Sequence, residues 1–125
     1  MKSIPEKVNT AWHSRQEAIV FTTVDRNGIP NSIYATCTSK FNDSIFVVAD
    51  NFFHKTRENI LAGSKASILF ITKEGTSYQL KGTIKYYTSG EIYEDMKKWN
   101  PAHLPGNAAA ALEVEEVYAG SEELV

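Results

Sequence analysis

The sequence predicts a mainly β fold, an antiparallel β-barrel of about six strands with three short helices. Segments dense in β-branched and aromatic residues, which favour strands, recur along most of the chain. The turns between them are short, and short turns favour hairpins over the long crossovers that parallel strands require. At 125 residues the chain is long enough for one real core but too short for two. We therefore expect a single domain over residues 1–125.

Three helices are expected among these strands. Residues 5–15 carry apolar side chains at helical spacing, and Trp12 on that stripe is expected in the core. Residues 54–62 form the second helix, which ends at a glycine. The third has Ser89 as its expected N-cap and reaches residue 98 or 99.

The predicted strands cover residues 18–24, 30–40, 45–49, 66–71, 77–87 and 108–118. Asn27-Gly28 supplies the first hairpin turn, because both residues tolerate positive φ. Gly82 within a long strand indicates a bulge or a close approach of another backbone. On the last strand, Leu112, Val114 and Tyr118 are expected on one face.

Composition excludes several function classes. The net charge is −2 and the Lys and Arg residues are scattered, which argues against a general nucleic-acid-binding protein. The first seven residues lack the apolar core of a signal peptide, and no apolar run is long enough to span a membrane. We expect a cytoplasmic protein that binds neither nucleic acid nor membrane.

Hydrolytic and metal chemistry has little support in the sequence. The three histidines lack metal-ligand spacing, and there is no Walker-type phosphate loop. Cys37, the only cysteine, excludes an internal disulfide, and a buried apolar role is favoured over a nucleophilic one. The glutamates at 113, 115 and 116 fit a solvated strand face better than an acid/base pair. No catalytic residue is assigned.

The segment Asp50–Ile60 is the strongest candidate site. A predicted strand leads into it and a helix follows, so the unpaired first-turn N–H groups of that helix favour an anion. Lys55 and Arg57 add positive charge, and Thr56 adds a hydroxyl. The alternative is an ordinary solvated helix start. Residue types and spacing alone leave both open.

Four motifs in order give this chain a family resemblance. They are Gly28-x-Pro30-Asn31 before a strand, His54-Lys55-Thr56-Arg57-Glu58-Asn59-Ile60 after a strand, Tyr78-Gln79-Leu80-Lys81-Gly82 in a long strand, and a closing strand rich in Ala and Val. Together they span nearly the whole chain. The sequence resembles the FMN-binding split barrels of the pyridoxamine 5′-phosphate oxidase-like family, including its minimal FMN-binding proteins.

The resemblance implies a six-stranded antiparallel split β-barrel that forms a homodimer, with FMN at the interface. Lys55 and Thr56 would bind the phosphate, and Trp99 would cover the ring from the partner subunit. The strand at 34–37 would meet the flavin, residues 50, 51 and 53 would lie with backbone groups near its pyrimidine edge, and Gln79 would point toward the cofactor. The complete implied set is Tyr34, Ala35, Thr36, Cys37, Asp50, Asn51, Phe53, His54, Lys55, Thr56, Gln79 and Trp99.

The resemblance points to a small FMN-dependent oxidoreductase or electron carrier, because in such proteins the flavin performs the hydride or electron transfer. Synthesis of pyridoxal phosphate is not expected, since the chain ends at Val125 without the C-terminal region that full-length oxidases use on their substrate. The alternatives are the same barrel with a deazaflavin or haem, a non-enzymatic flavin-binding or stress-response module, and a purely structural dimer.

Overall fold

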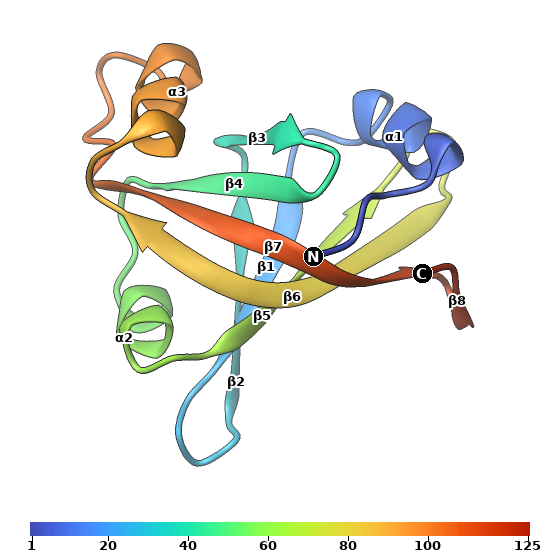
Figure 1. Ribbon diagram of the computed structural model, residues 1–125, viewed down its shortest axis with the longest axis horizontal. Helices are drawn as coiled ribbons and strands as arrows, with labels where there is room; N and C mark the ends of the chain where they lie inside the picture. The colour runs from blue at the N-terminus through green and yellow to red at the C-terminus, as the bar shows by residue number, and fades with distance from the viewer.

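The computed structural model describes all residues 1–125 and contains three helices and eight strands (Figure 1). The helices are α1 (Glu6–His13), α2 (Lys55–Leu61) and α3 (Glu91–Trp99). The strands are β1 (Ile19–Val24), β2 (Pro30–Ala35), β3 (Thr38–Asn42), β4 (Ile45–Asp50), β5 (Lys65–Ile71), β6 (Ser77–Tyr87), β7 (Ala108–Ala119) and β8 (Glu122–Glu123). No helix is both long and apolar enough to cross a bilayer.

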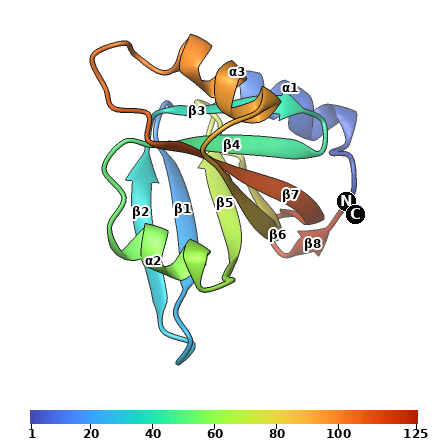
Figure 2. The ribbon, with the colours of Figure 1, turned by 60° about the vertical axis from the view of Figure 1, so that its left-hand side comes forward.

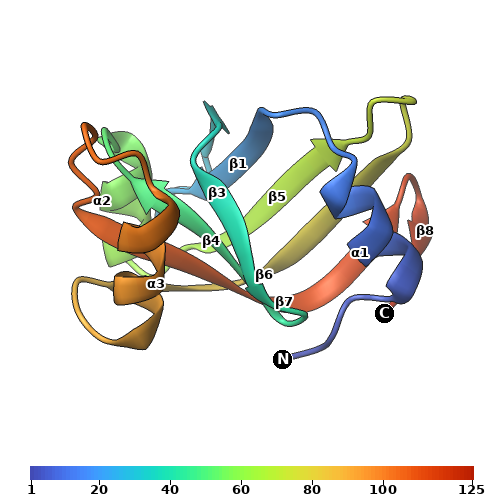
Figure 3. The ribbon, with the colours of Figure 1, turned by 90° about the horizontal axis from the view of Figure 1, so that it is seen from above.

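All strands belong to one antiparallel sheet in the order β2-β1-β5-β6-β7-β4-β3, with β8 added beside β7. The two ends of this path, β2 and β3, are separated in the chain only by Thr36 and Cys37. The sheet must therefore curl until its ends approach each other, as the view from above shows (Figure 3). This is the expected split barrel, and the split lies between β2 and β3.

The main core fills the curled sheet, and α1 closes one end of it while α2 lies at the other (Figure 1). Trp12 of α1 is 2% exposed and packs edge-on against Phe46 and Phe70, with ring centroids 4.8 and 5.1 Å apart. Such edge-to-face contacts are a favourable aromatic geometry. The prediction that Trp12 belongs to the core is confirmed.

A second, smaller core lies on the outer side of β4 and β7, under α3 (Figure 2). Met96 of α3 is fully buried there against Val47. The alanines 108–111 of β7 are all fully buried, because alternate residues of this strand face the two cores. Small side chains at these positions fit a strand that is covered on both faces.

A bulge in β7 overturns one face assignment. Gly82 pairs with Val114 while Lys81 pairs with Glu116, so Glu115 is an extra residue. A Cβ on Gly82 would lie 1.9 Å from the carbonyl oxygen of Glu113, which confirms the predicted close approach. Because a bulge reverses the alternation, Val117 enters the core and Tyr118 does not share the face of Val114.

Three further expectations were wrong. Residues 30–40 form two strands, because the chain turns at 36–37 to reach the other end of the sheet; this and β8 raise the count from six to eight. Cys37 lies in that break and not inside a strand, although it is half-buried and packs against the small core under α3. Gly90, with φ 95°, occupies the N-cap of α3 instead of Ser89, because this turn needs a left-handed residue.

Candidate functional site

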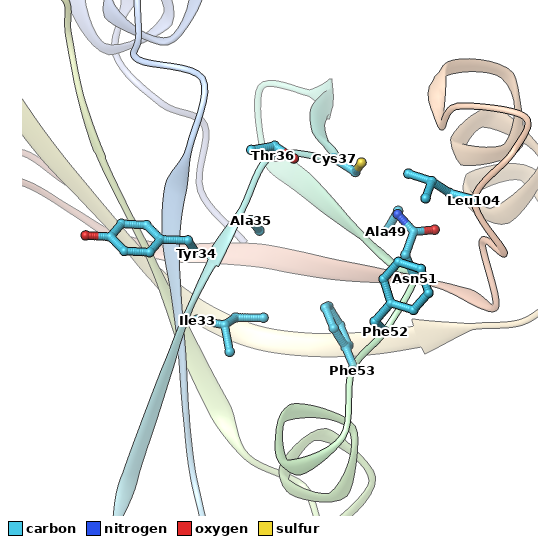
Figure 4. A pocket seen from close by; sticks show the side chains of 10 residues that line it. All are labelled: Ile33, Tyr34, Ala35, Thr36, Cys37, Ala49, Asn51, Phe52, Phe53 and Leu104. Atoms are coloured by element: carbon cyan, nitrogen blue, oxygen red, sulfur yellow. The ribbon is translucent and has the colours of Figure 1, made fainter.

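A pocket of about 320 Å³ opens at the split of the barrel, between β2 and the end of β4 (Figure 4). Its lining is mostly apolar and comes from three segments. The lining residues are Ile33, Tyr34, Ala35, Thr36, Cys37, Ala49, Asn51, Phe52, Phe53 and Leu104. An apolar concave site with a few polar groups is the usual form of a small-molecule site.

The crossover from β2 to β3 offers backbone donors to this pocket. The N–H groups of Thr36 and Cys37 have no hydrogen-bond partner within the chain. The carbonyl of Cys37 instead accepts from the N–H of Ala49 at 2.9 Å, which fixes the crossover against β4. Two unpaired donors beside an apolar slot can recognise ring carbonyls or ring nitrogens of a planar ligand.

Asp50 anchors the loop of residues 51–54, which forms the wall of the pocket opposite β2 and which we call the Asp50 loop. Its carboxylate is fully buried and accepts from Arg57 Nε at 2.8 Å, from the second guanidinium nitrogen at 2.9 Å, and from Tyr86 at 2.5 Å. The N–H of Phe53 donates to the same carboxylate at 3.0 Å. The hydrogen bonds that Arg57 donates, first to Asp50 and then to the Tyr86 hydroxyl, raise the pKa of Arg57. Burial and then the bond to Asp50 raise the pKa of Tyr86.

Beyond the α2 end of the pocket, after the lining residue Phe53, lie polar and cationic residues that are not part of the lining. Asn31 on β2 donates through Nδ2 to the hydroxyl oxygen of Thr56 at 3.1 Å. Lys55, beside Thr56, is exposed and has no ion pair. The charge of Arg57 is already paired with Asp50, whereas Lys55 lies in a neighbouring hollow that Asp25 and Arg26 also line.

At the other end of the pocket, residues 100–107 run from α3 to β7 and lie against the Asp50 loop. We call this segment the strap. Asn51 and Asn100 form a reciprocal pair of amide hydrogen bonds of 3.0 and 2.9 Å, and both residues are buried. Leu104 of the strap faces Cys37 and Asn51 across the pocket (Figure 4).

Comparison with known proteins decides the family. The family model for pyridoxamine 5′-phosphate oxidase matches residues 4–120. The chain belongs to the pyridoxamine 5′-phosphate oxidase family. An uncharacterized protein of Methanocaldococcus jannaschii is 32% identical over 108 residues, which cover 82% of this chain and 72% of that protein.

Solved structures of the same fold extend the comparison. HupZ of Group A Streptococcus has a TM-score of 0.81 and 26% identity, covering 96% of both chains. An FMN-binding protein from Syntrophomonas wolfei has a TM-score of 0.79 and 18% identity, covering 94% of this chain and 86% of that one. Other structures with this fold are an F420 reductase and HutZ, the heme storage protein of Vibrio cholerae.

The structure brings most of the site residues expected for a pyridoxamine 5′-phosphate oxidase relative to one side of the barrel. Residues 35–37, Asn51 and Phe53 line the pocket, and residues 54–56 follow directly at its α2 end. Asp50 lies behind the pocket wall, where it binds Arg57.

Three expected residues do not meet the pocket with their side chains in this chain. Tyr34 belongs to the stretch of β2 that borders the pocket, but its ring points away from the pocket, onto the outer face of the sheet (Figure 4). Gln79 pairs with Leu69 and Tyr118 on the sheet, outside the pocket. Trp99 packs against the small core under α3, and its buried indole Nε1 has no hydrogen-bond partner.

Sequence reasoning missed part of the pocket wall. Ile33 could have been found, since it is the inward neighbour of Tyr34 on an alternating strand. Phe52 follows Asn51 and is 78% exposed at the pocket. Nothing in the local sequence marks Leu104 or Asn100, because both reach the site through contacts about fifty residues away in the chain.

Proposed function

We propose that this protein binds FMN in the pocket at the split of the barrel and works as a small flavin oxidoreductase or electron carrier. The observation that carries the proposal is the order of groups along β2 and the start of α2. Unpaired backbone donors at Thr36 and Cys37 flank the apolar pocket, and Lys55 and the Asn31–Thr56 hydrogen bond lie beyond its Phe53 end, outside the lining itself. FMN has the same order of groups, with a planar ring, a ribityl chain and a phosphate dianion.

The polar end suits a phosphate. Lys55 is exposed and supplies a charge-assisted donor, while Thr56 is 1% exposed and its hydroxyl oxygen accepts from Asn31. From Asn31 to Ala35 the chain advances about 13 Å at roughly 3.3 Å per residue. This length of β2 separates the cationic end from the apolar part and leaves room for a ribityl chain between them.

When bound, FMN would supply hydride or single-electron transfer, which no side chain of this pocket performs alone. The protein's own residues would do three things. The N–H groups at 36 and 37 would orient the ring by hydrogen bonds, Ile33 and Phe53 would exclude water from it, and Lys55 would hold the phosphate. The Asp50–Arg57 pair would hold Phe53 and α2 in fixed positions relative to each other, because Asp50 binds both the N–H of Phe53 and the side chain of Arg57.

The functional unit that we propose is a homodimer. The outer face of β2, β1, β5 and β6 presents an apolar row, Tyr34, Val20 and Leu69, which continues to Gln79. Tyr34 is 81% exposed and Leu69 41% exposed, so these apolar side chains face solvent in the single chain. Such patches typically mark protein interfaces. A second copy on this face would bring its Gln79 toward the flavin of the first.

Two other cofactors suit the same barrel and define the alternatives. The F420 reductase and the heme storage protein HutZ share this fold, which supports a deazaflavin or haem as rival ligands. His103 precedes Leu104 on the strap and is exposed, outside the pocket lining. A flavin-binding module without turnover, or a dimer without any cofactor, are the non-enzymatic alternatives.

The decisive experiment is the absorption spectrum of the purified protein, followed by titration with FMN and riboflavin. We expect flavin bands, and tighter binding of FMN than of riboflavin because only FMN has the phosphate. Lys55→Ala should remove this preference, while Lys73→Ala, an exposed lysine on the β5–β6 turn, should keep it. A Soret band, or equal binding of both flavins by the unchanged protein, would overturn the proposal.

A further inference from the structure

The strap is held in place by the side chain of one residue on the opposite wall of the pocket. Asn51 Nδ2 donates to Asn100 Oδ1 at 3.0 Å, and Asn51 Oδ1 accepts from Asn100 Nδ2 and from the N–H of Gly106, each at 2.9 Å. The carbonyl of Asn51 also accepts from Asn107 Nδ2 at 3.3 Å. Both ends of the strap are therefore bound to a single buried asparagine.

A lysine of α3 completes the attachment. Lys97 Nζ donates to the carbonyls of Pro105 and Gly106 at 3.2 and 3.3 Å. Gly106 has φ +52°, and a Cβ there would lie 2.9 Å from Lys97 Nζ and 3.1 Å from Asn100 Nδ2. The left-handed φ disfavours a larger residue at this point, whereas the Lys97 side chain could move aside.

These attachments present one apolar side chain to the pocket. The N–H of Leu104 donates to the carbonyl of Pro101 at 3.0 Å, which closes a turn between the two anchored ends. Leu104 is the one strap residue that lines the pocket, and it points toward Cys37 and Asn51 (Figure 4). It stands at the end of the pocket away from Lys55, where the unpaired N–H groups of Thr36 and Cys37 lie.

The amide of Asn51 is already used by the strap. Its oxygen accepts two hydrogen bonds and its nitrogen donates one, so little capacity remains for a ligand. A buried polar network of this kind fixes an irregular segment in one position, because breaking it would leave buried amides unpaired. The network therefore fixes where Leu104 stands.

We propose that Leu104 binds the ring of the cofactor and that Asn51 is the positioning residue that holds Leu104 against it through the strap. This inference rests on the proposed flavin site. It assigns the ring end of the pocket to a segment 50 residues away from the phosphate end, so the two ends of the ligand are recognised by separate parts of the chain.

The test measures FMN and riboflavin affinity of the full-length protein freed of cofactor, by quenching of flavin fluorescence. Leu104→Ala should weaken both ligands equally, by about tenfold, because Leu104 meets only the ring. Leu104→Met keeps an apolar side chain of similar volume and should stay within about threefold of the unchanged protein. Lys55→Ala should instead weaken FMN alone.

A double-mutant comparison tests the role of Asn51. Asn51→Ala should weaken both flavins about as much as Leu104→Ala, and adding Leu104→Ala to it should cause little further loss. Asn51→Ala should also speed hydrogen exchange at the N–H of Gly106. If Asn51→Ala does not fold, Asn100→Ala breaks the same amide pair from the strap side.

The outcomes separate this inference from the proposed function. If the unchanged protein binds no flavin, the proposed function fails and this inference fails with it. If FMN binds and depends on Lys55, but Leu104→Ala binds both flavins as before, only the role of Leu104 is refuted. Losses from Asn51→Ala and Leu104→Ala that multiply in the double variant would refute the positioning role.

Discussion

Arg57 donates two hydrogen bonds to the buried carboxylate of Asp50, from Nε to Oδ2 at 2.8 Å and from Nη2 to Oδ1 at 2.9 Å. The contact joins the last residue of β4 to the first turn of α2, and Tyr86 of β6 binds the same carboxylate. One charge therefore ties three elements together at the base of the pocket loop. This also explains why Arg57, unlike Lys55, has no free charge for a ligand.

Removing the arginine should destabilise the fold. Arg57→Ala leaves Asp50 buried with only Tyr86 and a backbone N–H as partners, and an unpaired buried charge is costly. The Arg57 side chain is 35% exposed, so water can partly replace it. We expect the free energy of unfolding, measured in urea, to fall by about 2 kcal/mol.

The matched control is Arg26→Ala, because Arg26 is exposed and outside any ion pair. This variant should change the free energy of unfolding by less than about 0.5 kcal/mol. Equal effects of the two variants would contradict this account.

Tyr86 should make stability depend on alkaline pH. Burial and the hydrogen bond to Asp50 raise its pKa, so the folded state holds the phenolic proton more tightly than the unfolded state. Its contribution is therefore complete below about pH 10, the ordinary tyrosine pKa, and is lost as pH rises through the folded pKa. Tyr86→Phe should be less stable at neutral pH but should lose less stability between pH 9 and 11, roughly the titration range. Parallel curves for the two proteins would refute this.

Gly82 should tolerate no side chain. A Cβ at this position would lie 1.9 Å from the carbonyl oxygen of Glu113, and both backbones are fixed in the β6–β7 ladder. Gly82→Ala should cost about 3 kcal/mol in thermal or urea unfolding. Gly120→Ala is the matched control, because Gly120 has φ +59° but open space around it, and should cost only about 1 kcal/mol. The reverse ranking would show that the bulge is more pliable than its geometry implies.

The proposed dimer face can be tested with a single charge. Leu69→Asp places a carboxylate in the middle of the apolar row on the outer sheet face, where a partner would bury it without a counter-charge. We expect light scattering to give a dimer for the unchanged protein and a monomer for the variant. Leu61→Asp, on an even more exposed leucine of α2, should remain dimeric. Dissociation by both variants would not support this particular face.

Most of the fold could be predicted because its elements carry local signals. The continuous apolar run of β4 and the Trp12 stripe of α1 each identify their element without any tertiary information. The break between β2 and β3 could not be read in the same way. Residues 36 and 37 look like ordinary strand residues, and the chain turns there only because the curled sheet brings its two ends together.

The residues of the candidate site also fall into those with a local sequence signal and those placed only by contacts distant in the chain. Lys55 and Thr56 follow a strand and begin a helix, so their place at the start of α2, shortly after the pocket-lining Phe53, was predictable from sequence. Asn100 and Leu104 belong to an irregular segment whose place is set by hydrogen bonds to Asn51, across nearly half the chain. No periodic pattern reports such contacts. Gln79 remains a prediction, since its side chain would reach a cofactor only from a second subunit.

The four buried alanines of β7 have a consequence for how this protein can change. They form a thin partition, with the barrel interior on one side and the small core under α3 on the other. The strap runs from α3 to β7 at Ala108 and is held by the buried amides of Asn51 and Asn100. None of its residues belongs to the main core, so the pocket wall at Leu104 is separate from the interior of the barrel. A change of apolar side chain at Leu104 would therefore alter one end of the pocket without altering the packing of the barrel interior.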